Sequence, residues 1–389
     1  MKPELIDDES IPLARKSVLP GEGFFIPDEV ETRKREAAID EAVRDAPAVI
    51  LADPDADGLA CVAILGAVVG DLGLVPTDPR GLSQTLERLA RRVADGTGQA
   101  EPAAVQADTS VAPVELTDVY VCDLAPDSAA AVEPALQALT AAGVTVRWYD
   151  HHKWEASIAE AVRAAGVELV RGDSESECTA DVVVRTLDGT IPDRLATLAA
   201  VTRDHDLWIK SDPRSDDLAD YAYWADPEEY VETVREHGPD LPDEVEAYLQ
   251  DRRVEKDALI QRAVDRAAFV DVGDITVGVT YGRCSQNEVA EELRITGADA
   301  AVIVKPAGSA SLRGSEGFER CHEVARLVGG GGHPRAAGCM PPIYDDMLDF
   351  SHHWVTRGAE AKRTILDAFQ TVMAGPPSGE SPPDGGPKS

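Results

Sequence analysis

The chain has 389 residues, 43% of them hydrophobic, which is enough to bury the cores of two domains. Its 71 acidic residues outnumber 37 basic ones, so the formal net charge is −34 and the surface repels polyanions at ordinary ionic strength. The six cysteines form no C-x-x-C pair, which argues against a zinc ribbon or a redox motif.

Apolar segments alternate with helical patterns over the first half of the chain. Residues 1 to about 30 are rich in acidic residues and proline, and we expect them to be an irregular extension. Residues 92–117, rich in Ala, Gly, Pro and Thr, are expected to be a flexible insertion. The predicted strands are 48–53, 119–123 and 144–149, and the predicted helices are 31–46, 59–68, 128–142 and 155–165. This alternation predicts an α/β fold with a mostly parallel, doubly wound sheet, in which ligands bind beyond the carboxyl ends of the strands.

The second half of the chain contains a further, smaller α/β unit. An apolar helix is predicted at 192–203, and a long charged helix within 236–268 is interpreted as a connector. The second unit has predicted strands from residue 275 and at 301–305 and 309–313, and a helix at 319–328. The predicted division is an extension at 1–30, a first domain at 31–235, a connector at 236–268, a second domain at 269–345, a C-terminal helix at 346–374 and a disordered tail at 375–389.

The first three strands each end on an aspartate, namely Asp53, Asp123 and Asp150. The first strand continues into Asp55 and Asp57, which in an extended stretch would face the same way about 7 Å apart. That spacing suits ligands of two adjacent metal ions. The alternative is an acidic turn of the calcium-binding type, but Ile64 stands where an EF-hand loop needs Glu.

The second and third strand ends add carboxylates and imidazoles. Asp123 is a metal-ligand candidate, with a cap of the helix after Pro126 as the alternative. Asp150 is followed by His151 and His152, and two consecutive histidines allow one imidazole to ligate a metal while the other binds phosphate or orients a ligand. Hard oxygen ligands with imidazole indicate a divalent metal site for phosphate chemistry.

Two further motifs are candidates for the same chemistry. Asp204-His205-Asp206 ends a predicted helix and offers one more carboxylate, the alternative being solvated charges at a helix terminus. Four glycines at 329–332, followed by His333 and Arg335, predict a backbone nest for phosphate, the alternative being a flexible hinge. Ser311 and Arg313, in a predicted strand, are expected to face the same ligand.

Taken together, these motifs resemble the DHH phosphoesterase family, which includes RecJ-type nucleases, oligoribonucleases and cyclic dinucleotide phosphodiesterases. The resemblance covers roughly residues 36–345. It makes 31–235 a DHH catalytic domain and 269–345 a DHH-associated substrate-binding domain, with the active site in the cleft between them. Two departures matter: Leu51 stands where many relatives carry histidine, and the fourth motif offers both Asp204 and Asp206.

The resemblance implies a site with two Mn²⁺ ions, with Mg²⁺ as the alternative ion. One ion would be held by Asp55, Asp123 and either Asp204 or Asp206, and the other by Asp57, Asp123, Asp150 and His151. Asp123 would then bridge the two ions, and His152 would lie beside the scissile phosphate, with Asp53 as a second catalytic residue. The implied substrate-binding residues are Ser311, Arg313, Gly330, Gly331, Gly332, His333 and Arg335.

Three functions compete at this point. An exonuclease for short single-stranded nucleic acid is favoured, because aromatic residues make up only 5% of the chain and no stacking platform for long strands is evident. After residue 345 there is also room only for a helix and a tail, rather than for an added oligonucleotide-binding barrel. A phosphodiesterase for cyclic dinucleotides or other small phosphoesters is the alternative. A binding protein with a degenerate site is disfavoured because the carboxylates and histidines are all present.

The charge and the cysteines also bear on the surroundings of the protein. In molar salt the Debye length falls to about 3 Å, so the composition favours a halophilic, haloarchaeal protein over an acidic mesophilic one. Scattered cysteines fit a reducing cytosol, and neither an apolar run of about 18 residues nor a secretory signal is found. We therefore expect a cytoplasmic protein that binds an oligonucleotide or nucleotide and has no membrane partner, with a monomer and a homodimer both open.

Overall fold

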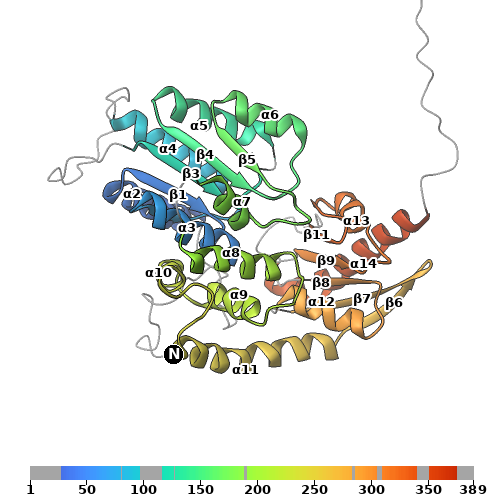
Figure 1. Ribbon diagram of the computed structural model, residues 1–389. Coiled ribbons are helices and arrows are strands. Elements are labelled where there is room, and N and C mark those ends of the chain that lie inside the picture. The colour runs from blue at the N-terminus through green and yellow to red at the C-terminus, as the bar shows by residue number, and fades with distance from the viewer. Residues whose placement is uncertain are drawn as a thin grey trace, which may run out of the picture. The chain divides into compact units, whose positions relative to one another are not determined.

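The computed structural model describes residues 28–79, 81–96, 116–126, 128–187, 191–282, 285–304, 309–339 and 350–374. The chain divides into two compact units, Met1–Leu249 and Gln250–Ser389, and the boundary falls within helix α11 (Asp243–Asp265) (Figure 1). Most of the predicted insertion at 92–117, most of the N-terminal extension and the whole predicted tail lie outside the described residues. No helix in the described ranges is long and apolar enough to cross a membrane.

The first unit is built on a five-stranded parallel sheet in the order β2-β1-β3-β4-β5. Its strands are β1 (Ala48–Ala52), β2 (Gly73–Pro76), β3 (Asp118–Cys122), β4 (Thr145–Asp150) and β5 (Glu168–Arg171). All five residues of β1 are buried, because an inner strand of a parallel sheet is covered on both faces. The predicted α/β class with a parallel sheet is confirmed.

Helices cover both faces of this sheet (Figure 1). Val49 and Leu51 of β1 face one layer, whereas Ile50 and Ala52 face the other, as the alternation of a strand requires. The helices of the first layer are α2 (Asp28–Asp45), α4 (Leu82–Gly96), α5 (Ala129–Ala141) and α6 (Ala156–Ala164). Those of the second layer are α3 (Ala56–Val69), α7 (Thr179–Thr186), α8 (Asp193–Asp206), α9 (Arg214–Trp224) and α10 (Pro227–His237).

The strand order determines where a ligand would bind in this unit. In a sheet with the order 2-1-3-4-5, the connections leave β1 and β3 toward opposite faces, which opens a crevice at their carboxyl ends. Two of the three aspartate-ended strands predicted from the sequence are these two strands. The third, β4, lies beside β3.

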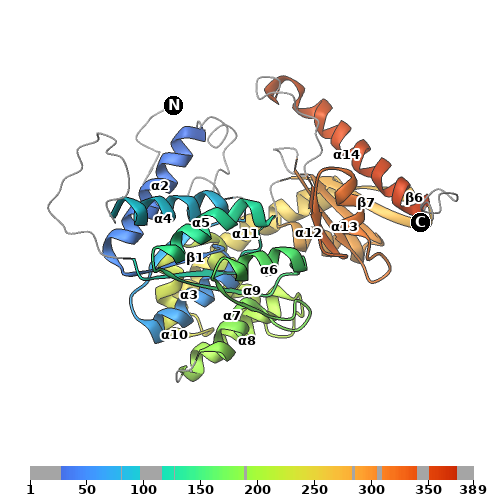
Figure 2. The same cartoon turned by 90° about the horizontal axis from the view of Figure 1, so that it is seen from above.

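The second unit contains a six-stranded mixed sheet in the order β10-β11-β9-β8-β7-β6, and it confirms the predicted second α/β unit. Only β7 and β8 pair in parallel among its described strands. Helix α12 packs on one face of this sheet, and α13 and α14 pack on the other (Figure 2). The elements are β6 (Ala268–Val272), β7 (Ile275–Tyr281), β8 (Ala300–Val304), β9 (Ala310–Gly314), β10 (Gly331–Gly332), β11 (Ala336–Cys339), α12 (Gln286–Ile295), α13 (Cys321–Leu327) and α14 (Phe350–Ala374).

Candidate metal centre

The turn after β1 places the first carboxylates. Asp55 is the N-cap residue of α3, and its Oδ1 accepts hydrogen bonds from the backbone N–H groups of Asp57 (3.1 Å) and Gly58 (3.0 Å). The helix therefore begins at Ala56, so the expectation that 55–57 is an extended stretch is wrong. A Cβ atom at Gly58 would lie 2.1 Å from the carbonyl oxygen of Asp53, which explains the glycine.

Asp57 is buried against the first residues of α7. Its Oδ2 accepts from the Thr179 N–H (2.6 Å) and its Oδ1 from the Ala180 N–H (2.8 Å). These N–H groups have no partner within their own helix, and the helix N-terminus favours a negative charge. An ionised carboxylate has about four acceptor positions, so these two bonds leave lone pairs on Asp57 for a cation.

Asp123 follows β3 in a left-handed conformation, with φ of 58°, and only 3% of it is exposed. Its Oδ1 accepts a hydrogen bond from the Thr179 hydroxyl (2.9 Å). The next helix, α5, has Ser128 rather than Asp123 as its N-cap residue, which excludes the helix-cap alternative. A positive φ at a residue other than glycine costs energy and is often retained at functional sites.

Asp150 is completely buried and holds its neighbours in place. Its Oδ1 accepts from His152 Nδ1 (2.8 Å) and its Oδ2 from Trp154 Nε1 (2.5 Å). Both oxygens are therefore engaged within the protein, in a way that fixes the ring of His152. This arrangement resembles the carboxylate–imidazole pairs that orient histidines in active sites.

His151 directs its Nε2 atom toward Asp123 and Asp206. Its Nδ1 lies 2.9 Å from the Glu177 carbonyl oxygen, and because a carbonyl only accepts, Nδ1 carries the proton. The other ring nitrogen, Nε2, faces Asp206 Oδ2 at 3.4 Å and Asp123 Oδ1 at 3.6 Å. A neutral imidazole whose other nitrogen is bound to a backbone carbonyl is the usual state of a metal-ligating histidine.

The two aspartates at the end of α8 have different surroundings. Asp204 accepts hydrogen bonds from the backbone N–H and hydroxyl of Ser211, from the Asp212 N–H and from the Ser215 hydroxyl. Burial alone would raise the pKa of Asp204, but these hydrogen bonds lower it to about 2. Asp206 instead faces His151. The structure thus brings Asp206, but not Asp204, to the carboxylate–imidazole cluster.

The negative charges of the cluster are close enough to repel one another. Burial and the carboxylates of Asp57 and Asp55 raise the pKa values of both Asp123 and Asp206 well above their usual range. Burial alone would lower the pKa of His152, but its hydrogen bond to Asp150 and the surrounding carboxylates raise it to about 9. A cation would relieve the repulsion among these carboxylates.

Two groups of side chains have potential ligand atoms that all lie within 4.8 Å of one another: Asp57, His151 and Asp206, and Asp123, His151 and His152. His151 Nε2 and Asp206 Oδ2 are also buried and have no hydrogen-bond partner among the described residues. A cation between this nitrogen and this oxygen would give both buried atoms a partner. The residues therefore fit a divalent ion, and Asp55 lies beside them without entering either group.

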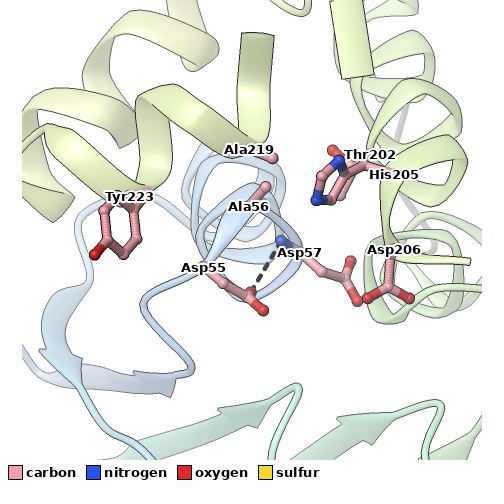
Figure 3. Close-up of a pocket in the computed structure, with 8 residues that line it drawn as sticks. All are labelled: Asp55, Ala56, Asp57, Thr202, His205, Asp206, Ala219 and Tyr223. Carbon is pink, nitrogen blue, oxygen red and sulfur yellow. Dashed lines mark hydrogen bonds between the residues drawn. The ribbon is translucent and has the colours of Figure 1, made fainter. Parts of the chain in front are cut away.

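A hollow of about 240 Å³ opens beside these carboxylates (Figure 3). Asp55, Asp57 and Asp206 form one edge of it. The remaining lining residues come from α3, α8 and α9, and are Ala56, Thr202, His205, Ala219 and Tyr223. Thr202, Ala219 and Tyr223 were not predicted from the sequence, because a helical position beside a metal site carries no motif of its own.

In the second unit, β9 and α12 hold two of the predicted substrate-binding residues. The Ser311 hydroxyl bonds Gln286 Oε1. Arg313 Nε donates to Asn287 Oδ1 (2.7 Å), and one of its terminal nitrogens donates to the carbonyl oxygens of Leu312 and Ala337. Burial lowers the pKa of Arg313, and these three hydrogen-bond partners are all neutral. Gln286 and Asn287 were not predicted, since an amide on a helix gives no signal in the sequence.

The glycine-rich segment forms a hairpin instead of the predicted nest. Gly331 and Gly332 pair with β11 in antiparallel register, and the Gly330 N–H donates to the carbonyl oxygen of Ala325. A Cβ atom at Gly330 would lie 2.1 Å from the Gly338 carbonyl oxygen, so close backbone packing accounts for this glycine.

His333 and Arg335, the two polar residues after the glycines, take part in this hairpin through their backbone. The His333 N–H closes the turn on the carbonyl oxygen of Ala336 (2.7 Å). Arg335 is exposed, and its own carbonyl oxygen accepts from the Gly314 N–H (2.8 Å). The backbone of both residues thus has a structural role in joining β9, β10 and β11.

Comparison with known proteins supports the fold. No family model matches the sequence, and no curated protein matches it. Among solved structures, the DHH domain of a protein assigned to a family of ribosomal proteins has a TM-score of 0.54 at 14% identity, and the match covers 89% of this chain and 90% of that one. The chain therefore has the fold of a DHH domain protein, as its motifs predict.

Two RecJ structures are also similar. RecJ from Thermus thermophilus with Mn²⁺ has a TM-score of 0.49 at 17% identity, over 85% of this chain, which spans about half (55%) of that protein. An exonuclease RecJ bound to manganese has a TM-score of 0.46 at 17% identity, over 85% of this chain and 94% of that one.

Proposed function

We propose that this protein is a metal-dependent phosphoesterase that hydrolyses phosphodiester bonds of short single-stranded nucleic acid. The observation that carries the proposal is the pair of ligand groups sharing His151 at the carboxyl ends of β1, β3 and β4. Hard carboxylate oxygens with one neutral imidazole suit Mn²⁺, and also Mg²⁺ when water completes the coordination.

We assign the metal-holding role to Asp57, Asp123, His151 and Asp206, with Asp55 at the edge of the site. Two bound divalent ions would supply a hydroxide near neutral pH and neutralise the attacked phosphate. Asp204 is omitted because its hydrogen bonds serve the chain after α8. Asp150 is also assigned a different role from the predicted one, because it enters neither ligand group and its two oxygens hold His152 and Trp154.

His152 is proposed to bind the phosphate that is attacked. In the metal-free protein the hydrogen bond to Asp150 and the surrounding carboxylates outweigh burial and raise the pKa of His152 to about 9. Nδ1, the ring nitrogen 3.7 Å from Asp123 Oδ1, already donates to Asp150, so we assign His152 to a phosphate oxygen through Nε2 rather than to a metal ion through Nδ1. Asp53, half-buried at the start of the turn after β1, stays the second catalytic candidate.

The second unit is proposed to bind another phosphate or the nucleotide end. Arg313 supports this because its guanidinium is half-buried and its three hydrogen-bond partners are neutral, so a phosphate oxygen would compensate its charge. Ser311, Gln286 and Asn287 add neutral donors and acceptors nearby. The glycines at 330–332, with His333 and Arg335, are proposed to contact the same ligand from the surface of their hairpin rather than as a nest.

The test is hydrolysis of a substrate panel in molar KCl with Mn²⁺, using labelled dinucleotides, single strands of about 24 nucleotides labelled at either end, and cyclic di-AMP. We expect dinucleotides and short strands to be cleaved, and activity to vanish in excess EDTA. Asp123→Ala should abolish cleavage, while Glu160→Ala, an exposed charge removal on α6, should leave it unchanged. Cleavage of cyclic di-AMP alone would favour the small-phosphoester alternative, and activity in EDTA would refute metal dependence.

Arg313→Ala should raise KM for dinucleotides far more than it lowers kcat, because the proposed role is in holding substrate. Arg320→Ala is the matched control, since Arg320 lies in the same unit and pairs with Glu323 on the surface. A loss confined to kcat would contradict the substrate-holding role.

A further inference from the structure

The hollow beside the carboxylates has a second half that metal binding does not explain. Asp55, Asp57 and Asp206 form one edge, while Tyr223 and His205 stand on opposite sides, with Ala56 and Ala219 between them (Figure 3). An aromatic ring and two methyl groups offer nothing to a hydrated cation. This half therefore suits a flat, largely apolar group attached to whatever the carboxylate edge holds.

Tyr223 provides an accessible aromatic ring at the end of α9. The residue is 52% exposed, and its ring makes an edge contact with Trp224, at 6.2 Å between centroids. A tyrosine that lines a hollow yet remains half exposed has a ring available for stacking. Ala219 lies one helical turn earlier on the same face of α9, and its small side chain leaves the space beside the ring open.

The opposite side of the hollow is held rigidly. His205 Nδ1 lies 2.9 Å from Asp216 Oδ1, and the His205 ring makes an edge contact with Trp208 at 5.3 Å. These contacts fix the orientation of the imidazole across from Tyr223. A planar ligand entering between the two rings would meet a wall that is already positioned, which lowers the entropic cost of binding.

Thr202 gives independent evidence for a ligand. It lines the hollow, is 1% exposed, and its hydroxyl oxygen has no hydrogen-bond partner among the described residues. A buried hydroxyl without a partner is unfavourable, so such groups are normally satisfied. A polar edge of a ligand in the hollow would satisfy it.

The size of the hollow narrows the ligand class. Its volume of about 240 Å³ is far more than one water needs, but below the roughly 300–1,000 Å³ of sites for drug-sized ligands. Because the carboxylate edge takes part of this volume, the remainder suits one small planar ring system with polar edges.

We propose that this half of the hollow is a subsite for one nucleobase, next to the phosphate that the carboxylate edge would hold through its metal ions. The base stacks on Tyr223, faces His205, and offers a polar edge to the Thr202 hydroxyl. The inference rests on the proposed function, because it assumes that the substrate carries a nucleobase beside the scissile phosphate.

The test is calorimetric binding of AMP and of ribose 5-phosphate to the full-length, Mn²⁺-loaded protein in molar KCl. These ligands share the phosphate and sugar and differ in the base. We expect AMP to bind at least about tenfold more tightly, the size of one base–aromatic stack. Tyr223→Ala and Ala219→Leu should remove the preference for AMP, whereas Tyr223→Phe should keep it. Thr202→Val should weaken the binding of AMP and leave the binding of ribose 5-phosphate unchanged.

Tyr281→Ala is the matched control, because Tyr281 is 42% exposed in the second unit and should not affect the preference. The same rise in melting temperature on adding Mn²⁺ in every variant shows that each one folds. Equal affinities for the two ligands in the wild type, or an unchanged preference in Tyr223→Ala, would overturn the subsite. Dinucleotide hydrolysis separates the two claims, since a base preference without hydrolysis refutes the proposed function and retains the base-binding hollow.

Discussion

Asp206→Asn is expected to stabilise the metal-free protein and, at the same time, to remove its stabilisation by Mn²⁺. The substitution keeps the size of the side chain and removes one negative charge. Asp206 faces His151 and lies in one ligand group with Asp57. Without a metal ion the charge of Asp206 repels the neighbouring carboxylates and destabilises the protein. With a metal ion the same carboxylate acts as a ligand.

The magnitude follows from the distance between the charges. Ligand atoms of Asp57 and Asp206 lie within 4.8 Å of each other, and at an effective dielectric constant of about 20 two unit charges at that distance repel by about 3.5 kcal/mol. The side chain of Asp206 is 23% exposed, so solvent screening reduces the relief to roughly 1–2 kcal/mol. In a unit of this size, that corresponds to a rise of about 2–8 °C in melting temperature.

The assay is thermal unfolding at about pH 8 in EDTA and in Mn²⁺, in parallel with Asp204→Asn. Asp204→Asn loses the charge that anchors Ser211 and Ser215, so it should lower the melting temperature under both conditions and keep the Mn²⁺ response. A lower melting temperature for Asp206→Asn in EDTA, or an intact Mn²⁺ response, would refute the assignment of Asp206 as a ligand.

Two further predictions concern the turn after β1 and the Asp150–His152 pair. Gly58→Ala should destabilise the protein by about 2 kcal/mol or more in urea unfolding and weaken Mn²⁺ binding, because its Cβ would lie 2.1 Å from the carbonyl oxygen of Asp53. Gly66→Ala on the same helix is the control. The nearest atom to its Cβ would be 3.8 Å away, so this variant should stabilise the protein by about 0.5–1 kcal/mol. In EDTA, NMR titration should give His152 a pKa near 9, and this pKa should fall toward 6.5 in Asp150→Asn. Since folding raises this pKa, the contribution of His152 to stability is complete below pH 6.5 and is lost as pH rises through about 9. A pKa near 6.5 for His152 in the wild type would contradict this prediction.

The fold was largely predictable because its strands are marked by composition. The apolar runs at 48–53, 119–123 and 144–149 correspond to β1, β3 and β4, and each is closed by an aspartate. By contrast, β5 (Glu168–Arg171) was missed, since an edge strand with exposed or half-buried residues carries no apolar run. Helices α9 and α10 were missed because acidic residues on their outer faces obscure a short apolar stripe.

The partners that position the site could not be read from the sequence. The Asp57 carboxylate is held by the N–H groups of Thr179 and Ala180, and His151 by the carbonyl oxygen of Glu177, which are backbone atoms more than twenty residues away in the chain. Every residue type has such backbone atoms, so no sequence motif indicates which of them hold the site. They become visible only when α7 is packed against α3 and β4.

The choice between Asp204 and Asp206 shows how a helix boundary determines a ligand. The predicted helix ended at residue 203, which left both aspartates in a terminus where either could turn toward the metal. In the structure α8 continues through Asp206. Residues two apart on a helix project about 200° from each other, so only one of the pair can face the cluster. The other therefore faces away, and Asp204 uses that position to bind the chain that leads into α9. Asp204 is thus the anchor of the loop that sets α9, and with it Tyr223, beside the proposed metal ligands.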